Sequence, residues 1–203
     1  SGNVSFYNGT NKKNINPTPV IGGIGLINKL SKPLSHNFKK NKSAILLIGK
    51  TFGHLEQSCF LKEIYSITDG MPPEINLLNE KNNGENVLKL IQSELVLSSH
   101  DVSSGGLIVA LSEMAMSSNY GIKIHKPKKL TNMFEYFFGE DQGRCILEID
   151  MKNLPKVEKI LKGSNIYYEN IGFTQVDYFE IESEIKIEVK ELYKVNNQWY
   201  NNY

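Results

Sequence analysis

The chain has 203 residues, and its 23 lysines and arginines nearly balance its 22 aspartates and glutamates, giving a formal net charge of +1. This balance excludes a general electrostatic attraction to nucleic acid or to an anionic membrane surface. Hydrophobic residues make up 40% of the sequence, which excludes a wholly disordered chain and suffices for one folded domain or slightly more.

The two cysteines, Cys59 and Cys145, are too few for a disulfide framework and suit a reducing compartment. We expect both to be buried free thiols. The apolar run Ala44–Ile48 is far short of the roughly 20 residues that a membrane span needs, and the first residues lack both a signal-peptide pattern and an initiating Met. We therefore expect a soluble cytoplasmic protein, or a piece of one, that contacts no membrane and no nucleic acid.

The first forty residues differ from the rest. Residues 8–19 are polar and predict an exposed loop, and the β-branched run at 20–27 is interrupted by three glycines, which weaken a strand. Pro33 blocks a helix through the basic stretch that follows. We predict that residues 1–32 are the tail of a preceding subdomain, 33–43 a linker and 44–203 a separate domain.

From residue 44 onward, strand-like and helix-like patterns follow one another in mixed order. The expected strands are 44–48, 74–78, 94–99, 120–125 and 144–149, followed by a period-two run at 179–189. The expected helices are 58–67 with Phe60, Ile64 and Ile67 facing inward, 83–93 with Asn83 as its cap, 105–117 and 153–161. This order favours an α+β fold over a regular βαβ array.

The segment 98–106 leads from an expected strand through a polar turn and two glycines into the strongest expected helix. Backbone amides at a helix N-terminus attract anions, so the turn suits a phosphate. Alternatively, Ser103 or Ser104 caps the helix and His100 bonds to nearby backbone. Both interpretations stay open.

Two further segments carry polar groups that suit a ligand. Asn3 can offer an oxygen to Mg²⁺, and the neighbouring glycine permits close approach of a nucleotide, although a plain strand and loop fits as well. Glu140 and Asp141 are adjacent acids that suit a metal, or else form a solvated turn that Arg144 neutralises. The spacing of the histidines argues against zinc, and no nucleophile elbow, phosphate loop or dinucleotide fingerprint is present in the sequence.

Taken in order, six segments resemble the C-terminal region of the phosphoribosylformylglycinamidine synthase family, in its large ATP-dependent subunit. They are Ser-Gly-Asn-Val-Ser-Phe-Tyr-Asn at 1–8, Pro-Thr-Pro-Val-Ile-Gly at 17–22, Ile-Gly-Lys-Thr at 48–51, His-Asp-Val-Ser-Ser-Gly-Gly-Leu at 100–107, Ala-Leu-Ser-Glu-Met-Ala at 110–115 and Phe-Gly-Glu-Asp-Gln-Gly-Arg at 138–144. The resemblance covers nearly the whole chain, and it is the ordered set that makes it specific.

The resemblance implies an AIR-synthetase-like C-terminal domain, a mixed sheet flanked by helices, preceded by the tail of an AIR-synthetase-like N-terminal subdomain. It implies a ligase of purine biosynthesis that converts formylglycinamide ribonucleotide to the amidine, with ATP and glutamine-derived ammonia. It also implies a glutaminase subunit and a small third subunit as partners.

By the same resemblance, Gly2 contacts ATP, Asn3 ligates Mg²⁺ and Ser5 contacts the ribonucleotide. The family's catalytic histidines and most of its metal-binding acids lie upstream, so we expect no catalytic residue in this chain and no turnover from it alone.

The sequence departs from the family pattern in two places. Ser104 stands where the family usually has Asp, and Glu56-Gln57-Ser58 stands where it has Gly-Gly-Ser; both changes argue against a second nucleotide site here. Asp141 and Gln142 are expected to be a non-catalytic copy of a substrate-binding segment in the first half of the enzyme. The alternatives are a structural, partner-docking subdomain and another ATP-using member of the AIR synthetase and selenophosphate synthetase superfamily.

Overall fold

The computed structural model describes residues 9–10, 13–14, 22–26, 33–127 and 132–201, which divide into two compact units, Ser1–Pro33 and Leu34–Tyr203. In the smaller unit, β1 (Gly9–Thr10) and β2 (Lys13–Asn14) form an antiparallel pair. Residues 22–26 are exposed and have no helix or strand, in keeping with their three glycines.

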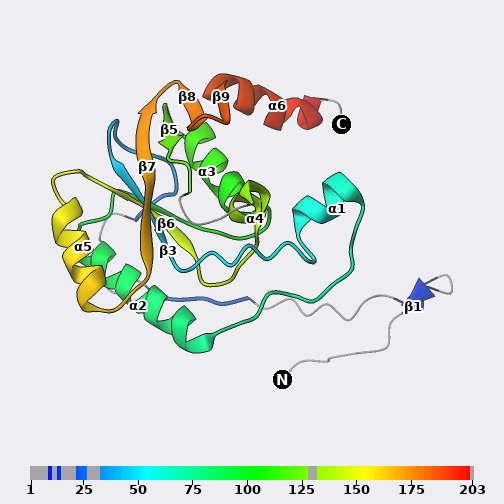
Figure 1. Ribbon diagram of the computed structural model, residues 1–203, viewed down its shortest axis with the longest axis horizontal. Helices are drawn as coiled ribbons and strands as arrows, with labels where there is room; N and C mark the ends of the chain where they lie inside the picture. Colours follow the sequence, from blue (N-terminus) through cyan, green and yellow to red (C-terminus); the bar gives the residue numbers. More distant parts are fainter. Residues whose placement is uncertain (1–8, 11–12, 15–21, 27–32, 128–131, 202–203) are drawn as a thin grey trace. The chain divides into compact units, whose positions relative to one another are not determined.

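The larger unit is built on a seven-stranded mixed sheet (Figure 1). Its strands are β3 (Ala44–Ile48), β4 (Ser98–Asp101), β5 (Tyr120–Ile124), β6 (Cys145–Ile149), β7 (Tyr168–Val176), β8 (Tyr178–Ile181) and β9 (Ile185–Glu188). They lie in the order β4-β6-β3-β7-β5-β8-β9, and all neighbours are antiparallel except β5 and β8, which are parallel. The expected α+β class is confirmed.

Helices cover both faces of this sheet (Figure 1). They are α1 (Cys59–Tyr65), α2 (Leu77–Gln92), α3 (Gly106–Met116), α4 (Met133–Phe138), α5 (Leu154–Gly163) and α6 (Val189–Asn201). The hydrophobic core on one face includes residues of α3 and α4, and the core on the other face includes residues of α2 and α5. None of the helices in the described ranges combines the length and apolar character of a membrane span.

The central strand β3 shows why the sheet is covered on both sides. Its five residues are all buried, with Ile45 and Leu47 in the core beside α3, and Leu46 and Ile48 in the core beside α2 and α5. Successive side chains of a strand point to opposite faces, so an unbroken apolar run requires packing on both.

The segment before β3 is packed on the sheet, although the sequence predicts a linker at 33–43. Phe38 is buried, and the buried carboxylate of Glu148 on β6 accepts hydrogen bonds from the backbone nitrogens of Lys39 at 2.8 Å and Lys40 at 3.0 Å. The hydroxyl of Ser98 also donates to Glu148 at 2.7 Å. These three hydrogen-bond donors compensate the burial of the Glu148 carboxylate.

Most of the expected strands and helices are present, with two corrections in the first half. Residues 74–78 are no strand, because the side chain of Asn76 accepts the backbone N–H of Asn79 and α2 begins at Leu77, so that Asn83 is not the cap. The expected strand at 94–99 begins four residues later and ends two residues later, at Ser98–Asp101.

Helix α1 forms where it is expected, but its apolar side chains do not face a core. It has no buried residue, and its aromatic contact with the domain is made by Phe60, whose ring stacks on Phe138 and Phe134 of α4 at centroid distances of 4.5 and 5.5 Å. Ile64 is 66% exposed, which corrects the expected inward face.

Candidate functional site

Gly2, Asn3 and Ser5, the residues expected to contact ATP, Mg²⁺ and the ribonucleotide, lie outside the described residues. Their roles therefore stay predictions. The other expected ligand segments, 98–106 and 138–144, lie within the described residues and meet at one end of the sheet.

The side chain of Asp141 holds the loop at residues 52–54 by hydrogen bonds. Its buried carboxylate accepts the backbone N–H groups of Phe52, Gly53 and His54 at 2.9, 3.0 and 3.1 Å. Three donors to one carboxylate satisfy its charge without a metal. The described residues contain no group of three or more His, Cys, Asp or Glu side chains that could hold a metal ion.

Glu140 occupies the anion position that the sequence predicts at the start of α3. Its Oε1 atom accepts the N–H of Gly105, the N-cap of α3, at 2.8 Å, and that of Cys59, the first residue of α1, also at 2.8 Å. The N-cap residue of α3 is Gly105, which has no side chain to offer, so the expected capping by Ser103 or Ser104 is wrong. A carboxylate of the protein itself stabilises both helix N-termini.

Arg144 completes this buried corner. Its guanidinium donates to the carbonyl oxygens of Gly139 at 2.6 Å and Asp141 at 3.3 Å, and to the hydroxyl of Thr51 at 3.2 Å. Burial lowers the pKa of Arg144, and the nearby Asp141 carboxylate opposes that shift. Because Arg144 and Asp141 are both 3% exposed, the segment is neither a solvated turn nor a metal site but a structural clamp.

His100 is held by side chains rather than by the expected backbone. Its Nε2 atom lies 2.9 Å from a carboxylate oxygen of Glu113 on α3, and its Nδ1 atom lies 3.2 Å from Asp101. The ring also packs edge-on against His36, with centroids 5.3 Å apart. These contacts join the end of β4 to α3.

The two cysteines are free, but only one is shielded. Cys59 is exposed, whereas Cys145 is partly buried, and desolvation raises the pKa of its thiol to about 12. The expectation of two buried thiols is therefore wrong for Cys59, which lies at the exposed start of α1.

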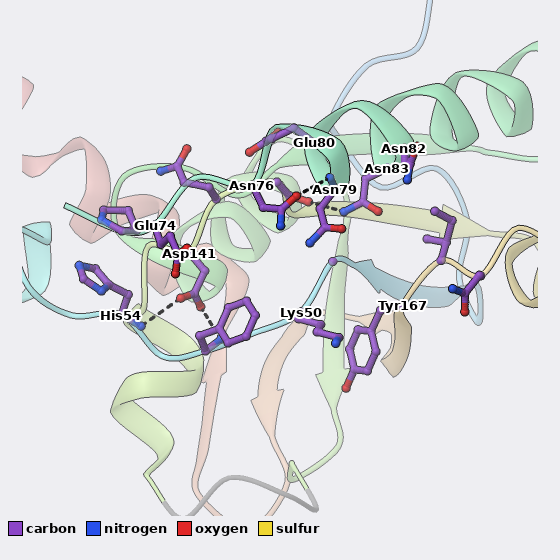
Figure 2. A pocket seen from close by; sticks show the side chains of 17 residues that line it. Lys50, His54, Glu74, Asn76, Asn79, Glu80, Asn82, Asn83, Asp141 and Tyr167 are labelled. Atoms are coloured by element: carbon purple, nitrogen blue, oxygen red, sulfur yellow. Dashed lines mark hydrogen bonds between the residues drawn. The ribbon is translucent and has the colours of Figure 1, made fainter.

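An open cavity of about 770 Å³ lies beside the clamp (Figure 2). Four segments form its walls: the loop after β3, the N-terminal half of α2 with the residues before it, the 141–143 loop, and residues 165–167 before β7. Side-chain amides dominate the lining, from Asn76, Asn79, Asn82, Asn83, Gln142 and Asn165.

The polar lining includes both charge signs. Lys50 contributes a cation, with its Nζ atom 5.8 Å from the centre of the Tyr167 ring, and Glu74 and Glu80 contribute carboxylates. The hydroxyl of Tyr167 donates to Glu169 at 2.7 Å, and this hydrogen bond raises the pKa of Tyr167 to about 12. The amides, the carboxylates and the lysine of this lining suit hydrogen-bonded and ionic contact with a polar ligand.

A second cavity, of about 470 Å³, lies on the other side of Gln142 and Gly143 and includes Ser103 and Ser104. The two cavities share these loop residues and Asn83, whose Nδ2 atom donates to the carbonyl oxygen of Gly143 at 2.9 Å. The segments that the sequence singles out thus line open space, and of their acids Glu140 and Asp141 are bonded to backbone N–H groups, whereas Asp101 is exposed.

Sequence reasoning missed the residues of α2 that face the larger cavity. Asn76, Asn79, Glu80 and Asn83 follow the spacing of one helical face, and this pattern was the available signal. It also missed Glu56 and Gln57 as hydrogen-bonding residues, because their partners lie at residues 70 and 71.

A mixed sheet with helices on both faces, an acidic loop bonded to backbone amides and two polar cavities beside that loop define this α+β domain. Residues 43–178 match the family described as AIR synthase related protein, C-terminal domain. The chain belongs to this family.

Curated relatives match the chain over its whole length. The phosphoribosylformylglycinamidine synthase subunit PurL of Pelagibacter ubique (strain HTCC1062) is 45% identical over 203 residues, and that of Rhodopseudomonas palustris (strain HaA2) is 39% identical over 203 residues. The chain spans 28% of the length of each. The resemblance to this synthase family is confirmed.

Solved structures show the same fold. The structure described as T. maritima PurL complexed with FGAR has a TM-score of 0.64 and 16% identity, covering 79% of this chain and 29% of that chain. T. maritima PurL complexed with ATP has a TM-score of 0.60 and 16% identity, covering 79% of this chain and 27% of that chain. At this identity the similarity is one of fold alone.

Proposed function

We propose that the chain is the C-terminal region of the large, ATP-dependent subunit of a cytoplasmic phosphoribosylformylglycinamidine synthase. The observation that carries this proposal is the 45% identity to the P. ubique subunit across all 203 residues. The six ordered motifs support it, because they lie in both units of the chain and in loops as well as in the core.

The proposed reaction uses this chain for positioning. ATP phosphorylates the formamide oxygen of formylglycinamide ribonucleotide, ammonia adds to the activated carbon, and phosphate leaves to give the amidine. Such a reaction needs positioned donors and a cation more than a protein nucleophile. In this proposal Gly2 contacts ATP, Asn3 ligates Mg²⁺ and Ser5 contacts the ribonucleotide.

Magnesium in this proposal is shared with another part of the polypeptide. The described acids Glu140, Asp141 and Glu148 are already bonded to backbone or hydroxyl groups, and the resemblance gives the oxygen of Asn3 as this chain's ligand. An amide oxygen is a suitable but weak ligand for a hard cation, so in this proposal carboxylates from elsewhere in the longer polypeptide complete the site.

The proposed partners are a glutaminase subunit, which supplies ammonia from glutamine, and a small third subunit. The solved structure described as PurLQS from Thermotoga maritima, with a TM-score of 0.59 and 18% identity over 79% of this chain, supports an assembly of this kind. Its similarity to this chain is in the fold.

The test is a chimera in which this chain replaces the matching 28% of the P. ubique subunit. With ammonia supplied, we expect release of ADP that depends on formylglycinamide ribonucleotide, and no release from the 203-residue chain alone. Asn3→Ala should raise the Mg²⁺ concentration needed for half-maximal rate, whereas Asn8→Ala should not. An inactive chimera that is folded by circular dichroism counts against the proposal.

A different ATP-using member of the superfamily is the alternative. The HypE-HypF complex structure matches with a TM-score of 0.51 and 15% identity, covering 76% of this chain and 54% of that chain, so the fold alone does not separate the two. Substrate-dependent ADP release by the chimera, measured with each candidate substrate in turn, separates them.

A further inference from the structure

The end of α1, the connection that follows it and the start of α2 expose an unusual number of large apolar side chains. Besides Tyr65, which is 57% exposed, six that are not aromatic lie within residues 64–78, and each is between 44% and 78% exposed. We name this set the apolar ridge: Ile64, Ile67, Met71, Ile75, Leu77 and Leu78. Single exposed apolar residues are normal on a protein surface, but a concentration of them marks a surface that contacts something else.

The ridge is held in a fixed conformation despite having no helix or strand between residues 66 and 76 (Figure 1). Glu56 accepts the backbone N–H of Met71 at 2.7 Å, and the side-chain amide of Gln57 donates to the carbonyl oxygen of Gly70 at 3.0 Å. His54 contacts the carbonyl oxygen of Met71 through its Nε2 atom at 2.9 Å. Three side chains from one loop thus hold the turn at residues 70–71.

This turn is built for the contact with Glu56. Gly70 has a φ of +108°, and a Cβ atom there would lie 2.6 Å from the carboxylate oxygen of Glu56. Gln57 itself adopts a left-handed φ of 59°, which is unfavourable for a residue with a side chain. The glycine at residue 70 and the left-handed conformation of Gln57 together allow the close contact between this turn and the loop that holds it.

The ridge also borders the larger cavity. Pro73, Glu74 and Asn76 come from the same stretch and line that cavity (Figure 2). Interfaces between folded domains commonly combine exposed apolar side chains with a neighbouring polar surface that forms hydrogen bonds.

We propose that the apolar ridge docks a further folded part of the same polypeptide. This inference rests on the proposed function, in which the chain is one region of a longer subunit. The curated relatives supply the length that such an occupant needs, because the match to this chain leaves 72% of each relative (100% minus 28%) outside it. An apolar surface whose backbone is held by hydrogen bonds suits a permanent interface with another part of the polypeptide, which forms as the polypeptide folds.

The experiment compares peroxide oxidation of two methionines by mass spectrometry. Met71 on the ridge and Met151 elsewhere are 71% and 53% exposed, so both should oxidise readily in the 203-residue chain, because oxidation follows exposure. In the chimera described above, we expect oxidation of Met71 to slow about tenfold, while that of Met151 stays within about twofold.

Matched variants separate the ridge from a general effect. Ile75→Glu in the chimera should restore fast oxidation of Met71. Ile185→Glu, which changes an isoleucine on β9 that is 47% exposed, should leave Met71 protected. If the chimera does not fold, the chain is mixed with the remaining part of the P. ubique subunit as a separate polypeptide, and unchanged Met71 oxidation overturns the proposal.

The outcomes distinguish the ridge from the proposed activity. An active chimera with Met71 oxidised as fast as in the free chain overturns the ridge alone. An inactive but folded chimera with Met71 protected overturns the activity and supports the ridge. Protection that appears in the free chain as its concentration rises indicates a second copy as the occupant, and that result also overturns the proposal.

Discussion

The Oε1 atom of Glu140 lies 2.8 Å from the backbone nitrogen of Gly105, so the N-terminus of α3 is closed by a carboxylate from a loop 35 residues away in sequence. The same atom accepts from Cys59 at the start of α1. A phosphate at this helix start would have to displace Glu140.

Replacing Glu140 by Ala should therefore destabilise the domain by about 2 kcal/mol, since two charge-assisted hydrogen bonds are lost at once. Urea unfolding measures this. Added formate should raise the unfolding midpoint of Glu140→Ala more than sodium chloride at equal ionic strength, because formate can occupy the vacated position. Glu63→Ala, at an exposed residue of α1, should change stability little; a loss equal to that of Glu140→Ala would contradict this account.

Two glycines should respond to alanine in opposite directions. A Cβ atom at Gly121 on β5 would lie 1.9 Å from the carbonyl oxygen of Tyr178, whereas one at Gly84 in α2 would meet nothing within 4 Å. Gly84→Ala should stabilise the protein by about 1 kcal/mol, since alanine is the better helix former. Gly121→Ala should destabilise it by about 3 kcal/mol, because backbone must move to relieve the contact.

Thermal unfolding of the two variants beside the parent chain provides the measurement. A stable Gly121→Ala protein would mean that β5 and β8 do not approach as closely as they do here. The near-contact at Tyr178 and the parallel pairing of the two strands would then both have to be revised.

The cysteines should react at very different rates with a thiol reagent such as Ellman's reagent. Cys59 is exposed and should react at once, giving about one fast thiol per chain. Cys145 should react only on unfolding, because desolvation raises its pKa to about 12 and leaves little thiolate at neutral pH. Cys59→Ser should remove the fast phase, and two fast thiols in the folded chain would refute the burial of Cys145.

Acid should weaken the attachment of the segment before β3. The Nζ atom of Lys40 lies 2.7 Å from Asp150, and this hydrogen bond, with a second one from the backbone of Lys152, lowers the pKa of Asp150. A carboxylate whose pKa is lower in the folded state contributes stability above its unfolded value of about 4, and that contribution is lost as the pH falls through the folded pKa.

The Asp150→Asn variant should therefore lose less stability than the parent when the pH is lowered through this range. Urea midpoints measured at a series of pH values give the comparison. Asp69→Asn, at an exposed residue without such a bond, serves as the control. Its urea midpoint should fall with decreasing pH as steeply as that of the parent.

The sequence predicts those helices and strands whose own apolar pattern requires them to be buried. The run at β3 and the stripe of Leu107, Leu111 and Met114 on α3 can only be buried, and both are. Strand β7 was missed although it lies at the centre of the sheet, because Glu169, Asn170 and Gln175 interrupt its apolar pattern. Helices α4 and α6 were missed as well.

The candidate site was harder to predict, because its geometry depends on residues that are far apart in the sequence. The motif at 138–144 is visible in the sequence, but Asp141 reaches its three donors 87 to 89 residues away. The spacing of residues within a short motif gives no information about hydrogen bonds to residues so far away in the sequence. The metal site and the solvated turn therefore both stayed open, and the clamp became visible only when the fold placed the 52–54 amides against the carboxylate.

The position of β7 also fixes an order of events during synthesis. This strand pairs with β3 on one side and β5 on the other, yet it is made more than a hundred residues after β3. Until it leaves the ribosome, the two older strands each present an open hydrogen-bonding edge, and such edges recruit other chains. The nascent polypeptide is thus most exposed to aggregation just before β7 emerges, which is when a chaperone would have most to protect.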